Sequence, residues 1–139
     1  MIKALLDTNV VLDALASRKP FCEQAEKIFM LVAEEKIQGF ITANSLTDIY
    51  YLIRKGVTEA TARDTLRNLL QLFSVVGITE NDCVAALDLL ITDYEDALLV
   101  VCAEKAAIDC IITRDEDFLQ SAPSAISPAV FLEDNINRE

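Results

Sequence analysis

Short apolar runs alternate with longer amphipathic segments along nearly the whole sequence, and this alternation limits the folds that the chain can adopt. The apolar runs have the length and residue preference of buried strands; they are residues 2–6, 39–42, 75–78 and 110–113. The segments between them carry apolar residues at helical spacing, as at Leu46, Ile49 and Ile53. Strands joined by helix-length connectors form right-handed crossovers, so the sequence predicts an α/β fold with a parallel sheet covered on both faces.

Helix starts and strand ends can be placed from local signals. Pro20 and Ala43 mark two helix starts, Thr79 caps a third helix, and Thr92 or Asp93 opens a fourth. Residues 126–128 lead into a closing helix around Phe131. In open parallel sheets, ligands bind beyond the carboxyl ends of the strands, and we therefore expect functional side chains at that edge.

The size and composition of the chain favour one compact domain that spans residues 1–139. The sequence is 53% hydrophobic, has no run long enough for a membrane helix, and shows no signal-peptide pattern after Lys3. We therefore expect a soluble cytoplasmic protein without a membrane partner. The cysteines match neither a zinc site nor a redox pair, so we expect buried, reduced thiols at Cys22, Cys83, Cys102 and Cys110.

The formal net charge of −11 counts against a polyanionic substrate. Bound divalent cations weaken this objection because they invert the local field, and basic residues can still cluster where a nucleic-acid backbone runs. The candidates for such a cluster are Arg18, Lys19, Arg54 and Lys55.

Aspartates follow the predicted strands or open the predicted helices in a chain that contains no histidine. They are Asp7, Asp48, Asp93, Asp96, Asp115 and Asp117. Each has an ordinary interpretation as a helix cap, a turn residue or a solvated side chain. Together they are expected at one edge of the sheet, where unpaired carboxylates are costly without a cation. Oxygen-only ligands suit Mg²⁺ or Mn²⁺, so the pattern favours a divalent-metal site and phosphoryl chemistry.

Four motifs closely resemble those of the PIN-domain ribonucleases, in order and in separation. They are residues 5–13 (LLDTNVVLD), 42–51 (TANSLTDIYY), 93–97 (DYEDA) and 113–118 (TRDEDF), followed by residues 126–132 near the end. Within that family, the chain is similar to the bacterial group that includes the toxins of VapBC-type toxin–antitoxin pairs. The resemblance implies a three-layer α/β/α sandwich around a parallel sheet of about five short strands, and Mg²⁺- or Mn²⁺-dependent cleavage of RNA.

By the same resemblance, the core metal ligands and catalytic residues are Asp7, Asp96 and Asp115, with Asp48 in the second acidic position and Asp117 as an outer ligand. Thr8, Asn9, Ser45, Asp93 and Thr113 would support them. The implied partners are an RNA substrate, an antitoxin protein and a second copy of the chain. Two positions depart from the family pattern: Asp48 replaces the commoner glutamate, and Leu99 stands where related chains often carry a polar residue.

In the expected reaction, bound metal supplies the nucleophilic hydroxide and stabilises the leaving oxygen, because the chain has no histidine. The products would carry 5′-phosphate and 3′-hydroxyl ends. A haloacid-dehalogenase-type phosphatase would need an acid where Asn9 stands, and a phospho-accepting receiver domain would need paired early acids and a late strand-end lysine. The main alternative is a catalytically degenerate PIN module that binds RNA or proteins as a scaffold.

Overall fold

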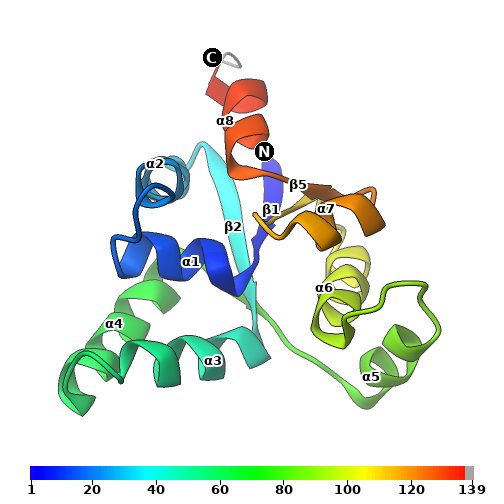
Figure 1. The fold of residues 1–139 in the computed structure, drawn as a ribbon, viewed down its shortest axis with the longest axis horizontal. Coiled ribbons are helices and arrows are strands. Elements are labelled where there is room, and N and C mark those ends of the chain that lie inside the picture. The colour runs from blue at the N-terminus through cyan, green and yellow to red at the C-terminus, as the bar shows by residue number, and fades with distance from the viewer. Residues whose placement is uncertain (137–139) are drawn as a thin grey trace.

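The computed structural model describes residues 1–136 and contains a five-stranded sheet in the order β3-β2-β1-β4-β5, in which every neighbouring pair is parallel (Figure 1). The strands are β1 (Ile2–Leu6), β2 (Ile37–Thr42), β3 (Ser74–Val76), β4 (Cys110–Ile112) and β5 (Ala125–Ile126). The helices are α1 (Thr8–Leu15), α2 (Cys22–Ala33), α3 (Ala43–Ile53), α4 (Glu59–Leu72), α5 (Glu80–Leu87), α6 (Tyr94–Lys105), α7 (Glu116–Ser121) and α8 (Pro128–Ile136). Residues 137–139, the end of the predicted domain, lie outside the described part.

Helices cover both faces of the sheet, as the α/β/α prediction requires. One apolar core joins the sheet to α1, α2, α4 and α8, while a second core joins the opposite face to α6 and α7 (Figure 1). Helix α5 packs on α6. The three-layer architecture is therefore confirmed.

Alternation along the central strands produces these two cores. Leu6 and Ile112 contribute to the first core, whereas Leu5 and Ile111 contribute to the second. All four side chains are completely buried. Successive side chains of a strand point to opposite faces, so a continuous apolar run is what a sheet covered on both sides requires.

Gly39 allows α2 and α4 to approach β2 closely. A Cβ atom at this position would lie 2.6 Å from ring carbons of Phe73 and 2.9 Å from the Val32 side chain. The first residue is the C-cap of α4, and the second lies in the last turn of α2. The absence of a side chain at Gly39 therefore sets the packing of this layer.

Most predicted boundaries agree with the structure. Helix α3 begins at Ala43, Thr79 forms a capping box with Asp82, and Asp93 caps α6. Others differ: α2 begins at Cys22 rather than at Pro20, β2 begins at Ile37 rather than at residue 39, and β3 spans Ser74–Val76 rather than 75–78. Residues 125–126, near the predicted lead-in to the last helix, form the edge strand β5.

The cysteine prediction is only partly correct. All four cysteines are free thiols, but only Cys102 is fully buried, while the other three are partly exposed. Burial raises the pKa of the Cys110 thiol to about 11. No helix among residues 1–136 is long and apolar enough to cross a membrane.

Candidate functional site

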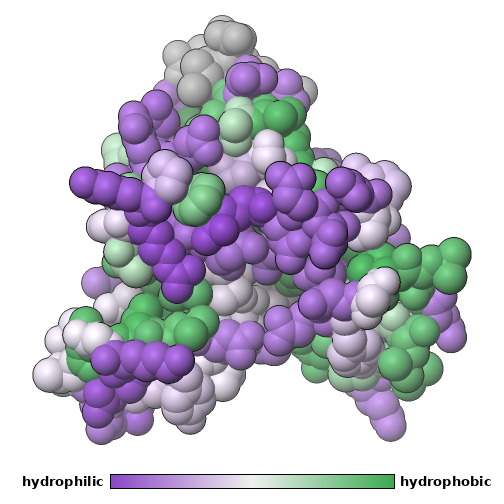
Figure 2. All heavy atoms as spheres, viewed as in Figure 1, coloured by the Kyte–Doolittle hydropathy of each residue, from purple (hydrophilic) through white to green (hydrophobic). Residues whose placement is uncertain are grey.

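Most of the predicted acidic residues gather where β1 and β4 end and where α6 and α7 begin, while Asp48 lies in the middle of α3. Asp7 follows β1 directly, and Asp115 follows β4 after a two-residue connection. In Figure 1 this edge of the sheet lies between the α3–α4 pair and the α5–α6 pair, and Figure 2 shows hydrophilic residues over the surface between them. The fold thus places the functional candidates at the edge where parallel sheets bind ligands.

Asp7 is held by hydrogen bonds to both of its carboxylate oxygens. Its Oδ1 atom caps α1 by accepting from the Thr8 backbone N–H at 2.8 Å. Its Oδ2 atom accepts from Thr113 Oγ1 at 2.8 Å and from Asn9 Nδ2 at 3.3 Å. Burial raises the pKa of Asp7, while the hydrogen bonds from Thr113 and Thr8 act to lower it. Asp7 therefore caps α1 with one oxygen, and its role as a helix cap does not exclude a role as a candidate metal ligand.

Asp96 is the buried member of the acidic group, with 8% of its surface exposed. It lies in the first turn of α6, where its backbone N–H donates to Asp93 Oδ1 at 3.2 Å. Burial, followed by repulsion from Asp93, Asp7 and Asp115, raises the pKa of Asp96 to about 7. A carboxyl group in such surroundings favours a proton or a cation.

Asp115 and Asp117 belong to the first turn of the short helix α7. Asp115 Oδ1 accepts from the backbone N–H groups of Asp117 at 3.0 Å and Phe118 at 3.4 Å, and both aspartates are exposed. A cavity of about 530 Å³ separates this turn from the start of α6. Its lining residues are Ile91, Thr92, Asp93, Asp96, Asp115, Asp117 and Ser121.

Asp48 approaches the group from α3, on the other side of the site, and does not line that cavity. Desolvation and then the charge of Asp48 raise the pKa of Glu95, an exposed residue in the first turn of α6. Sequence reasoning missed Glu95, because an acid in a first helical turn is equally well explained by the helix dipole. The structure adds it to the acidic group.

A hydroxyl network connects the starts of α1 and α3. Thr8 Oγ1 donates to Ser45 Oγ at 3.0 Å, and Ser45 Oγ lies 3.0 Å from Thr42 Oγ1. Thr42 Oγ1 also donates to Asn44 Oδ1 at 2.6 Å. Thr8 and Ser45 were predicted as supporting residues, whereas the completely buried Thr42 was not. The network fixes the two helices that carry Asp7 and Asp48.

The chemistry of the donor set fits a hard divalent cation. Among residues 1–136, no three Asp, Glu or Cys side chains are arranged in this structure so that they could together hold a metal ion. Mg²⁺ commonly retains several waters and binds proteins through only a few carboxylates, so an open group of carboxylates is compatible with it. The group is electrostatically coupled but not preassembled as a closed ligand shell.

The four predicted RNA-contacting residues lie beyond the ends of α1 and α3 and are all exposed. Two of them have partners within the chain: Arg18 Nη1 lies 3.9 Å from Asp13 Oδ1, and Arg54 Nη1 donates to the Val57 carbonyl at 2.9 Å. Both helices run from the acidic edge toward the same side of the molecule (Figure 1). The basic residues therefore lie at the ends of α1 and α3 that point away from the acidic edge, and they do not line its cavity.

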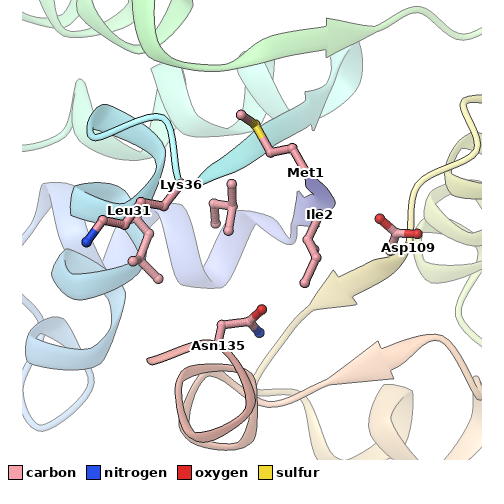
Figure 3. Close-up of a pocket in the computed structure, with 7 residues that line it drawn as sticks. Met1, Ile2, Leu31, Lys36, Asp109 and Asn135 are labelled. Atoms are coloured by element: carbon pink, nitrogen blue, oxygen red, sulfur yellow. The ribbon is translucent and has the colours of Figure 1, made fainter. Parts of the chain in front are cut away.

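A second hollow, of about 640 Å³, lies at the opposite edge of the sheet, where the strands begin. Figure 3 shows Met1 and Ile2 at the start of β1 facing Leu31 of α2 and Asn135 of α8, with Asp109 to one side. This larger hollow lacks the group of carboxylates. The smaller acidic cavity is therefore the better candidate for the functional site.

Comparison with known proteins identifies the family of the chain. Residues 3–117 match the PIN domain family model. No curated protein sequence matches the chain. A toxin–antitoxin complex from Klebsiella pneumoniae is similar in structure, with a TM-score of 0.69 at 20% identity over 90% of this chain and 97% of that one.

Two further solved structures have the same fold. VapBC2 from Rickettsia felis, bound to a DNA fragment from its promoter, gives a TM-score of 0.67 at 18% identity, over 91% of this chain and 97% of that one. VapC20 from Mycobacterium tuberculosis, described as a sarcin-ricin loop cleaving toxin, gives 0.68 at 15% identity, over 86% and 95%. The family match spans most of the sequence, and the chain belongs to the PIN domain family.

Proposed function

We propose that this protein is a Mg²⁺- or Mn²⁺-dependent endoribonuclease that hydrolyses phosphodiester bonds of single-stranded or structured RNA. The observation that carries the proposal is the burial of Asp96 beside a cavity lined by further aspartates, with its pKa raised to about 7. Repulsion from Asp93, Asp7 and Asp115 adds to the effect of burial. A bound divalent cation would compensate this repulsion, and membership of the PIN family supports nuclease chemistry.

Asp7, Asp96 and Asp115 would hold the cation, with Asp48 and Asp117 as more distant carboxylates. When bound, the ion supplies an activated water and neutralises charge on the phosphodiester. Thr113 and Asn9 orient Asp7 through its Oδ2 atom. Asp93 fixes the first turn of α6, and therefore the position of Asp96, by accepting from its backbone N–H. In metal sites, hydrogen bonds of this kind orient the ligand side chains and adjust their basicity.

The proposal includes a role as the toxin of a toxin–antitoxin pair, with an antitoxin protein as partner. The structural neighbours from Klebsiella pneumoniae and Rickettsia felis are toxin–antitoxin proteins, which supports this assignment. Co-expression with the product of the adjacent open reading frame tests it. Rescue of growth and co-purification as a complex would support a cognate antitoxin, while growth unaffected by expression of the active nuclease would contradict the toxin role.

A non-catalytic scaffold is the second candidate, because the acidic side chains do not form a closed ligand shell. The two functions differ in turnover. Purified protein should cleave single-stranded RNA with Mn²⁺ or Mg²⁺ and lose this activity with Asp7→Asn or with excess chelator. Asp64→Asn, at an exposed carboxylate paired with Arg67, is the matched control. Tight RNA binding without turnover would support the scaffold instead, and cleavage unchanged by both chelator and Asp7→Asn would contradict the metal mechanism.

A further inference from the structure

An ion pair between a buried carboxylate and a partly exposed arginine joins α1 to the loop between β4 and α7. Asp13, in the last turns of α1, is 1% exposed. Its Oδ2 atom accepts from Arg114 Nε at 2.6 Å, and its Oδ1 atom accepts from Arg114 Nη2 at 3.1 Å. The Arg114 guanidinium also lies 4.0 Å from the centre of the Phe21 ring. This fork-shaped contact is geometrically specific, because a guanidinium presents two parallel donors to one carboxylate.

The neighbours of Arg114 connect the pair to the acidic site. Thr113 donates to Asp7 Oδ2, and the Asp115 backbone N–H donates to Thr113 Oγ1 at 3.1 Å. The three-residue loop 113–115 therefore contacts α1 at its N-terminal cap, through Thr113, and near its C-terminal end, through Arg114. Two contacts at separate points of one helix fix both the distance and the rotation of the loop relative to that helix.

We propose that Asp13 and Arg114 form a positioning pair, which holds the 113–115 loop against α1 and so sets the position of the Asp115 carboxylate relative to Asp7. As a statement about catalysis, this inference rests on the proposed nuclease function. Neither residue touches the acidic cavity. Both act through their neighbours.

The geometry argues against the alternative that Arg114 binds the RNA backbone directly. Its Nε and Nη2 atoms already donate to a buried carboxylate, and its guanidinium carbon lies over the Phe21 ring, 4.0 Å from the ring centre. Releasing Arg114 to a phosphate would leave Asp13 buried without a strong partner, since Arg18 lies 3.9 Å away and is more exposed. Leaving a buried charge uncompensated is strongly destabilising.

The test is Arg114→Lys, which keeps the positive charge and loses the fork. Amide hydrogen exchange, measured in chelator, should accelerate at Asp115, Asp117 and Phe118, whose N–H groups are bonded within the loop. The amides of Asp82 and Cys83 in α5 serve as an internal reference. Mn²⁺ affinity, followed by the electron paramagnetic resonance of the free ion, should fall roughly 10- to 100-fold, as for other residues that support metal ligands. The kcat for RNA should fall with little change in KM.

Arg67→Lys is the matched control, because the same substitution is made at an exposed ion pair with Asp64. It should leave exchange, Mn²⁺ affinity and kcat unchanged. Should Arg114→Lys fail to fold, the double variant Asp13→Asn/Arg114→Gln removes both charges and avoids a lone buried carboxylate. The same loop-specific acceleration is expected of it.

The outcomes separate this inference from the proposed function. Unchanged loop exchange together with unchanged Mn²⁺ affinity would overturn the positioning pair, as would exchange that accelerates equally in α5. Failure of both variants to fold would also overturn it, because the pair would then stabilise the whole fold. If wild type neither binds Mn²⁺ nor cleaves RNA while loop exchange still accelerates in Arg114→Lys, the nuclease proposal fails and the loop-holding role of the pair stands.

Discussion

The Thr113 hydroxyl donates a hydrogen bond to Asp7 Oδ2 at 2.8 Å and joins the ends of β1 and β4 across 106 residues of sequence. The two strands are neighbours in the sheet, with Leu6 paired to Ile112. The same hydroxyl accepts from the Asp115 backbone N–H. One completely buried threonine therefore connects two of the three proposed core ligands.

Thr113→Val tests this connection, because valine has nearly the same shape and lacks the hydroxyl. We expect the pKa of Asp7 to rise, since a hydrogen bond that lowers it is lost. Mn²⁺ affinity should fall roughly 10- to 100-fold, and loss of the hydrogen bond to the Asp7 carboxylate should cost about 1–3 kcal/mol of stability. Calorimetric Mn²⁺ titration and thermal melting measure the two effects. Thr113→Ser should restore both, and a valine variant with wild-type affinity would show that the hydroxyl does not support the site.

The strand ends and helix caps could be predicted because their signals are local. Asp7, Asp93 and Asp115 follow apolar runs or precede helical patterns, and each is an N-cap in the structure. A cap must stand at the end of its element, so its approximate place in a parallel sheet follows from the topology. The order of strands and helices in the sequence is therefore enough to predict that these three residues lie near the same edge of the sheet.

The Asp13–Arg114 pair could not be predicted in the same way. The two residues are 101 positions apart, and their contact depends on how the 113–115 loop packs against the far end of α1. In the sequence, Asp13 looks like an ordinary polar residue of an amphipathic helix. Its near-complete burial is a tertiary property, which no periodicity indicates.

Exposed basic residues beyond α1 and α3 should steer RNA toward the acidic edge. Because Arg18 and Arg54 have partners within the chain, Lys19 and Lys55 are the better test. Lys19→Gln and Lys55→Gln should each raise KM more than they lower kcat, and each should reduce the slope of log affinity against log salt by about 1. Lys27→Gln, at an exposed residue of α2 paired with Glu23, is the control. Steady-state kinetics at several salt concentrations would reject the assignment if both lysine variants matched this control.

The glycines provide a test of packing that is independent of the site. Gly39→Ala should destabilise the fold by about 1–3 kcal/mol, because its Cβ atom would overlap the Phe73 ring and Val32. This corresponds to a drop in melting temperature of roughly 4 °C for each kcal/mol. Gly77→Ala is the matched control, since nothing lies within 4 Å of the Cβ atom it would add. Equal melting temperatures for the two variants would contradict the close approach of α2 and α4 to β2.

The raised pKa of Asp96 predicts how the stability of the metal-free protein changes with pH. The folded-state value of about 7 lies above the ordinary value of 3.8, so the folded protein binds more protons than the unfolded chain between these values. Stability in chelator should therefore fall as pH rises through this window, with the full penalty present above about pH 7. Asp82 has a pKa lowered by Lys105, and its stabilising contribution is lost only as pH falls below the ordinary aspartate range, outside this window.

Asp96→Asn should remove much of this pH dependence and raise the melting temperature in chelator by several degrees at about pH 8, because the buried charge is gone. Asp115→Asn should act in the same direction with a smaller effect, since Asp115 is exposed. Asp64→Asn, at an exposed carboxylate outside the acidic group, should leave the dependence of melting temperature on pH unchanged.

Saturating Mg²⁺ or Mn²⁺ should reverse the order of melting temperatures, because wild type gains binding free energy that the site variants cannot. Thermal melting across pH, with and without metal, measures each part. Site variants that melt below wild type in chelator, combined with no stabilisation of wild type by metal, would contradict a coupled carboxylate site.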